Sequence, residues 1–120
     1  TILLEDDEDS VRELAEEMLR RFGYEVLTAA DGESALEIYR GRKEGISLII
    51  LDLIMPGMGG GKCLEEILKI DPNQKVIVAS GYSAKGLRQE LLENTVNGYI
   101  EKPYEIASML AAIREAMDQD

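Results

Sequence analysis

The sequence contains no histidine among its 120 residues. This absence excludes catalysis by a histidine acid or base, a Ser-His-Asp triad and any metal site with imidazole ligands. Cysteine is almost as scarce, because Cys63 is the only one. A single cysteine can form neither an intrachain disulfide nor a CxxC site, and we expect Cys63 to act as a small buried hydrophobic residue. This cysteine usage fits a reducing compartment, and we expect a cytoplasmic location.

Basic residues are also few. The chain has 13 Lys and Arg against 24 Asp and Glu, which gives a formal net charge of −11. Nucleic-acid binding needs a basic face that neutralises phosphates, so we expect no direct nucleic-acid binding. An acidic surface is suited instead to divalent cations or to basic partners.

Long apolar runs are missing as well. No run approaches the ~20 residues that span a bilayer, and no basic-then-apolar signal segment opens the chain, so we expect no membrane insertion by this domain.

The length fits one domain, residues 1–120, and a hydrophobic content of 45% is sufficient for a core. The chain begins at Thr1 and enters an apolar run at once, so we expect a domain of a longer protein, or one with trimmed ends.

Short apolar segments alternate with amphipathic ones along the chain. The candidate strands are residues 2–5, 24–29, 47–52, 75–80 and 98–101. Nearly continuous aliphatic runs such as LIIL and VIVA are typical of parallel strands whose two faces are both buried.

Helical periods separate these strands. The first helix is expected to begin at an N-cap at Asp9 or Ser10 and to end at Gly23. Its apolar face is predicted to hold Val11, Leu14, Ala15, Met18, Leu19 and Phe22. Four more helices are predicted over about 33–43, 60–69, 84–94 and 104–117. Their inward residues are predicted to be Ala35, Ile38 and Tyr39; Leu64, Ile67 and Leu68; Leu87, Leu91 and Leu92; and Ile106, Met109, Leu110, Ile113 and Met117.

The strict alternation of strand and helix predicts an α/β fold with right-handed crossovers and helices on both faces of a parallel sheet. Five strands in this length match a single flavodoxin-like, doubly wound (βα)5 domain. Its five-stranded sheet would have the order 2-1-3-4-5.

Polar residues stand where four of these strands end. In a doubly wound sheet, the ligand site lies at the carboxyl ends of the strands, near the switch in strand order. The first strand leads into Glu5-Asp6-Asp7-Glu8, the third ends at Asp52, the fourth at Ser80, and Lys102 follows the fifth. Each residue alone has an ordinary reading as a helix cap, a turn residue or a solvated charge. Their joint placement at one edge of the sheet favours a site.

Clustered carboxylates need a compensating cation. Two carboxylates ~5 Å apart repel by about 3 kcal/mol at an effective dielectric constant of ~20. Lys102 would supply one positive charge and magnesium (Mg2+), which prefers oxygen ligands, would supply two. The sequence therefore predicts a site for a hard divalent ion beside an anionic group, for which a phosphoryl group is the natural candidate.

Four segments carry a resemblance to a known family. The segments ILLEDDEDSVREL, LIILDLIMPGMGG, VIVASGYS and GYIEKPY resemble, in order and spacing, the receiver domain of two-component response regulators (CheY-like). The resemblance covers essentially the whole chain. The combination of SGYS with EKPY is most similar to receivers attached to hybrid sensor histidine kinases.

The resemblance implies a role for each site residue. Asp52 would be the phosphoacceptor, and Asp6, Asp7, Asp52 and the backbone carbonyl of Ile54 would hold Mg2+. Lys102 would pair with a phosphoryl oxygen, Ser80 would hydrogen-bond the phosphoryl group, and Tyr99 would be the aromatic switch.

The resemblance also implies the partners. A sensor histidine kinase or a histidine phosphotransfer domain would donate the phosphoryl group from a phosphohistidine. Phosphorylation would change the surface formed by helix 4, strand 5 and helix 5, through which a homodimer is a further expectation. We expect a signalling switch that catalyses only its own phosphorylation and dephosphorylation, not a separate enzyme.

The chain departs from the family pattern at several positions. Glu5 replaces a commonly apolar strand residue and would add charge near the metal, and Tyr104 replaces the commoner Phe.

The alternative function is a pseudo-receiver, an interaction module that is never phosphorylated. A haloacid-dehalogenase-type phosphatase is disfavoured because Ile54 stands where that class has a second aspartate. A flavodoxin is disfavoured because acidic residues after the first strand would repel a flavin phosphate.

Overall fold

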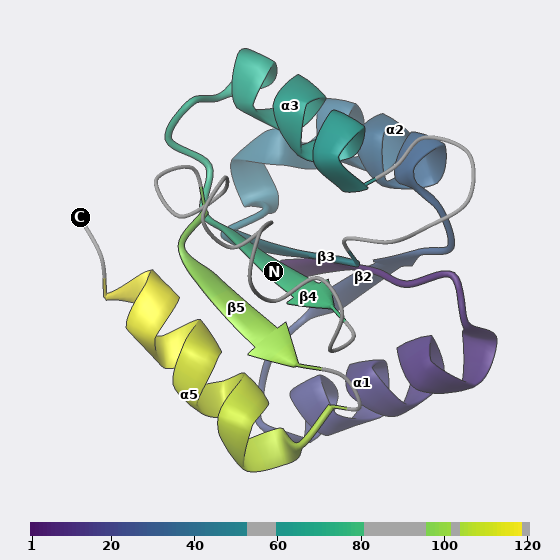
Figure 1. Cartoon of the computed structure of the whole chain (residues 1–120), viewed down its shortest axis with the longest axis vertical. Coiled ribbons are helices and arrows are strands. Elements are labelled where there is room, and N and C mark those ends of the chain that lie inside the picture. Colours follow the sequence, from purple (N-terminus) through teal and green to yellow (C-terminus); the bar gives the residue numbers. More distant parts are fainter. Residues whose placement is uncertain (53–59, 81–95, 102–103, 119–120) are drawn as a thin grey trace.

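This computed structural model describes residues 1–52, 60–80, 96–101 and 104–118, which form five strands and four α-helices (Figure 1). The elements are β1 (Ile2–Glu5), α1 (Asp9–Arg21), β2 (Val26–Ala29), α2 (Gly32–Arg42), a 3-10 turn (Lys43–Gly45), β3 (Leu48–Asp52), α3 (Gly60–Ile70), β4 (Val76–Ser80), β5 (Gly98–Glu101) and α5 (Ile106–Met117). Each of these strands and α-helices lies within two residues of its predicted bounds, and the 3-10 turn was not predicted. The helix predicted over 84–94 lies outside the described residues.

The sheet has the predicted topology. All neighbouring strands pair in parallel, and the order is β2-β1-β3-β4-β5. Every residue of β1 and β3 is buried, which explains why these strands read as continuous aliphatic runs. The flavodoxin-like α/β fold is therefore confirmed.

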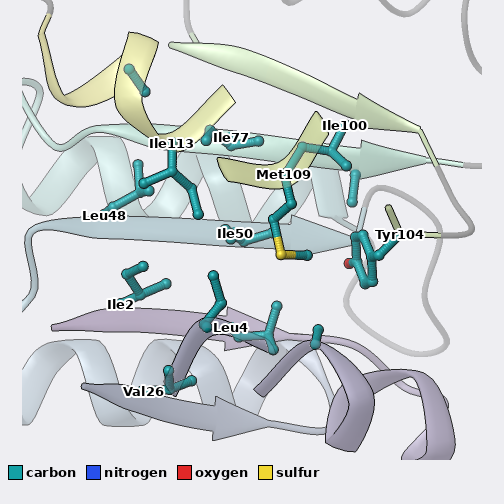
Figure 2. Packing of buried hydrophobic residues seen from close by; sticks show 14 residues of the cluster. Ile2, Leu4, Val26, Leu48, Ile50, Ile77, Ile100, Tyr104, Met109 and Ile113 are labelled. Carbon is teal, nitrogen blue, oxygen red and sulfur yellow. The ribbon is translucent and has the colours of Figure 1, made fainter. Parts of the chain in front are cut away.

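Helices cover both faces of the sheet. In Figure 1, α1 and α5 lie on one side and α2 and α3 on the other. Ala15 and Leu19 of α1 and Ile113 of α5 share one buried cluster with alternate strand residues, part of which Figure 2 shows around Ile50. The other cluster joins side chains of α2 and α3 to the opposite face. Each fully buried aliphatic side chain contributes ~1.5–3 kcal/mol, so the two clusters fix the strand ends in place.

Three apolar residues predicted to face inward are instead exposed. The exposed fractions are 53% for Leu14, 57% for Phe22 and 42% for Met117. Leu14 precedes the buried Ala15 by one residue, a turn of about 100° around the helix axis, and so lies at the border of the apolar face. Phe22 is the C-cap of α1 and Met117 is the last residue of α5. The apolar faces of α1 and α5 are therefore smaller than the periodicity indicated.

The start of α1 also differs from the prediction. The N-cap is Glu8, which is extended and makes no side-chain capping bond, rather than Asp9 or Ser10. The helix begins early because Oδ1 of Asp6 accepts the backbone N–H of Glu8 at 3.0 Å, and the carbonyl of Glu8 then accepts the N–H of Arg12. The predicted stop at Gly23 is confirmed, since its φ of +91° suits glycine.

The single cysteine is buried, as predicted. Cys63 is fully buried in the cluster under α2 and α3, and its thiol contacts the carbonyl of Gly32. Burial raises the pKa of this thiol to about 12. Among the described residues, no helix combines the length and the apolar character that a bilayer crossing requires.

Candidate metal centre

Three carboxylates meet at the carboxyl ends of β1 and β3. The two strands are adjacent, and their register places Glu5 opposite Leu51, so that Asp6 and Asp52 leave the sheet side by side. One oxygen each from Asp6, Asp7 and Asp52 lies within 4.8 Å of the others. Asp6 is fully buried, Asp52 is 4% exposed, and Asp7 is exposed. Residues separated by some 45 positions in the sequence thus form one group.

The main chain and the side chain of Asp6 are both held. Its N–H donates to the carbonyl of Ala29 at 3.1 Å, and its carbonyl accepts Nη1 of Arg12 at 2.8 Å. Oδ1 accepts the N–H of Glu8, and the hydroxyl of Tyr104 lies 3.4 Å from Oδ2. These contacts fix the turn that carries the acidic pair, which reduces the conformational freedom that ion binding would otherwise remove.

Glu5 lies beside this group although it is a strand residue. Its side chain is fully buried, Oε1 accepts the backbone N–H of Asp52 at 3.0 Å, and Oε2 has no hydrogen-bond partner among the described residues. Burial, and then the charges of Asp52, Asp6 and Asp7, raise the pKa of Glu5 to about 8, although the bond from Asp52 opposes the shift. The raised pKa favours the protonated form of Glu5 in the metal-free site. The expectation that Glu5 adds charge near the metal stays a prediction.

Tyr104 closes one side of the group. It is 8% exposed and belongs to the buried cluster that α1 and α5 form with one face of the sheet. Figure 2 shows its ring at the carboxyl end of β3, the strand that carries Ile50. Burial, together with the nearby charges of Asp6 and Asp52, raises the pKa of its hydroxyl. The phenol therefore stays protonated and can donate to Asp6. The only indication of this contact in the sequence is that position 104 holds a tyrosine, whereas the receiver pattern more often has phenylalanine there.

The other predicted site residues are described in part or not at all. Ser80 is the last residue of β4, in register with Glu101, but its side chain lies outside the described residues. Ile54 and Lys102 lie outside them entirely. Tyr99 on β5 is half-buried, pairs with Val78 in register and packs on that residue. The roles predicted for these four residues stay predictions.

The donor set fits a hard divalent cation. Three carboxylates whose oxygens lie within 4.8 Å supply the ligands that magnesium prefers, and one or two of them with additional oxygens suffice for that ion. None of the three offers the sulfur or imidazole that favours zinc. A divalent cation would also offset their mutual repulsion, which is on the order of 3 kcal/mol per pair at a dielectric constant of ~20.

Known proteins share both the sequence and the fold. Residues 2–114 match the family described as the response regulator receiver domain. The chain is 31% identical over 115 residues to the chemotaxis protein CheY of Thermotoga maritima, a match that covers 95% of this chain and 94% of that protein. It is 32% identical over 119 residues to the sensor kinase CckA of Brucella abortus, covering 99% of this chain but only 13% of that kinase.

A solved complex from Borrelia burgdorferi, CheX–CheY–BeF3–Mg2+, contains a chain of the same fold. The TM-score is 0.90 at 28% identity, and the match covers 98% of this chain and 89% of that one. The family match, the homologous CheY and the common fold agree with the acidic group found at the sheet edge. The chain belongs to the response regulator receiver domain family of two-component signalling.

Proposed function

We propose that Asp52 accepts a phosphoryl group from a phosphohistidine of a partner, a sensor histidine kinase or a histidine phosphotransfer domain. The observation that supports this proposal is the position of Asp52 at the end of a buried strand, with its carboxylate beside those of Asp6 and Asp7. A carboxylate held in this way is a nucleophile for phosphoryl transfer, as in other aspartyl-phosphate proteins.

The transfer requires little chemistry from the acceptor. A carboxylate oxygen of Asp52 attacks phosphorus, the P–N bond of the phosphohistidine breaks, and the imidazole nitrogen keeps the electron pair. Catalysis is then mainly positioning and charge stabilisation, which is compatible with a chain that has no histidine. Lys102 and Ser80 are the residues that we expect to contact the phosphoryl oxygens.

Asp6, Asp7 and Asp52 would hold Mg2+, together with the backbone carbonyl of Ile54. The ion would neutralise negative charge that develops on the phosphoryl group. The Borrelia burgdorferi relative was solved with BeF3 and Mg2+, which supports the same ion here. The fixed turn at Asp6 and the hydroxyl of Tyr104 would orient the ligands.

The output of the switch is proposed to be a change in the surface of helix 4, strand 5 and helix 5. Phosphorylation adds about 1.5–2 negative charges and three acceptor oxygens at one point, to which Ser80 and Tyr99 would respond. Strand 5 and helix 5 correspond to β5 and α5, whereas the predicted helix 4 lies outside the described residues. A homodimer through this surface stays a prediction.

The activity of any longer protein is a separate proposal. The chain spans 13% of the sensor kinase CckA and 94% of CheY, so both a hybrid-kinase receiver and a separate regulator are compatible with it. In either case we propose a cytoplasmic signalling switch whose only reactions are its own phosphorylation and dephosphorylation.

Treatment with acetyl phosphate tests the phosphoacceptor directly. Intact-protein mass spectrometry should detect one added phosphoryl group that requires Mg2+ and is absent from Asp52→Asn. Asp118→Asn removes an exposed carboxylate at the end of α5 and is the matched control. If the wild-type chain stays unmodified, the interaction-module alternative is favoured; if Asp52→Asn is still modified, Asp52 is not the acceptor.

A further inference from the structure

The side chain of Glu5 makes a contact that an apolar residue could not make. Oε1 of Glu5 accepts the backbone N–H of Asp52 at 3.0 Å, and the glutamate is fully buried. Asp52 is the last residue of β3, and its partner in β4 is Ala79. On the β1 side, the ladder register ends with the pair Glu5 and Leu51. The glutamate side chain thus adds a link to β1 one residue beyond the final register pair.

This link is costly for the fold. The carboxyl group of Glu5 is buried against the main chain of Asp52, and Oε2 lacks a partner among the described residues. A buried polar atom without a partner destabilises the folded state, and an apolar side chain of similar shape would avoid that cost. Residues that break a local rule in this way are expected mainly at functional sites.

We propose that Glu5 is a positioning residue for phosphorylation, which holds the main chain of Asp52 so that its carboxylate keeps a fixed orientation. The inference rests on the proposed function of Asp52. A fixed main chain at the nucleophile matters because displacement of a reacting group by about 1 Å can reduce a rate up to 100-fold. Glu5 acts through Asp52 and is not expected to touch the phosphoryl group.

Two substitutions separate the hydrogen bond from the shape of the side chain. Glu5→Gln keeps a carbonyl oxygen that can accept the Asp52 N–H, whereas Glu5→Met has a similar length and no oxygen acceptor. We expect the rate of phosphorylation by acetyl phosphate at saturating Mg2+ to fall about tenfold in Glu5→Met, the equivalent of one hydrogen bond. Glu5→Gln should retain most of the wild-type rate.

Thermal unfolding distinguishes positioning from support of the fold. Glu5→Met removes a buried carboxyl group but leaves the Asp52 N–H without its acceptor, so its effects on stability oppose each other. If Glu5 positions Asp52, Glu5→Met should be phosphorylated more slowly even at a temperature at which it is fully folded. A purely structural role predicts instead that stability and rate fall together. A rate that falls only in parallel with the melting temperature would overturn the proposal.

Hydrogen exchange at the Asp52 amide tests the contact without any phosphodonor or metal. In 15N-labelled protein, this amide should exchange about tenfold faster in Glu5→Met than in the wild type, with little change in Glu5→Gln.

The inference is overturned if Glu5→Met keeps the wild-type rate of phosphorylation, or if both variants lose that rate equally. If the wild type itself is not phosphorylated, the proposed function falls first and the inference falls with it.

Discussion

The hydroxyl of Tyr104 lies 3.4 Å from Oδ2 of Asp6, although 98 positions separate the two residues. This contact joins the segment that leads into α5 to the turn that follows β1. Because burial raises the pKa of the phenol, Tyr104 stays a donor throughout the physiological range. The contact places a neutral hydrogen-bond donor beside one of the three clustered carboxylates.

Removal of this donor should cost stability. We expect Tyr104→Phe to lower the free energy of unfolding, because it removes the hydroxyl that contacts Asp6. The loss should be only about 1 kcal/mol, because 3.4 Å is long for a hydrogen bond between two oxygens. Urea denaturation followed by circular dichroism measures the change. Tyr24→Phe is the control, since the hydroxyl of Tyr24 has no hydrogen-bond partner among the described residues. Equal stability of Tyr104→Phe and the wild type would show that the contact contributes nothing.

Magnesium should stabilise the folded chain through the acidic group. Millimolar Mg2+ should raise the melting temperature, because the ion binds the folded cluster and not the unfolded chain. Asp7→Asn should weaken binding at least about tenfold in a calorimetric titration, as expected for loss of a ligand. Glu8→Gln removes the adjacent exposed charge, which lies outside the cluster, and should have a smaller effect. A melting temperature insensitive to Mg2+ would contradict the assignment.

Stability of the metal-free protein should depend on the ionisation of Glu5. Its pKa is raised from 4.5 in the unfolded reference to about 8 in the folded chain, so folding takes up a proton between these values. The stabilisation is complete below pH 4.5 and is lost as the pH rises through about 8. With EDTA present, the unfolding free energy of the wild type minus that of Glu5→Gln should decrease as the pH rises across this window, because only the wild type loses this stabilisation. Parallel pH profiles for the two proteins would exclude the effect.

Two glycines should respond to alanine with opposite signs. Gly23 has a φ of +91°, whereas Gly41 lies in α2, where an added Cβ would meet no described atom within 4 Å. Gly23→Ala should destabilise the fold by about 1 kcal/mol or more, because a Cβ is strained at that φ. Gly41→Ala should stabilise it by up to about 1 kcal/mol. Denaturant midpoints measure both, and destabilisation of similar size in both variants would contradict this account.

Much of the fold was predictable from local patterns. The aliphatic runs of β1, β3 and β4 and the helical periods between them predicted the sheet order and placed each described strand and α-helix within two residues. The exposure of Leu14, Phe22 and Met117 was not predictable in this way, because periodicity defines an apolar direction but not the width of the surface that the sheet covers. The N-cap at Glu8 depended on a bond from its own N–H to the side chain of Asp6, which no capping pattern indicates.

The sequence by itself determined the parallel α/β architecture and the meeting of Asp6, Asp7 and Asp52, because the carboxyl ends of adjacent parallel strands must share one edge. Only the tertiary structure decided what surrounds those carboxylates. Burial raises the pKa of Glu5, whose Oε1 accepts the Asp52 N–H, and the packing of Tyr104 brings its hydroxyl to Asp6. Desolvation and long-range packing depend on every neighbouring element at once, so a linear pattern does not contain them.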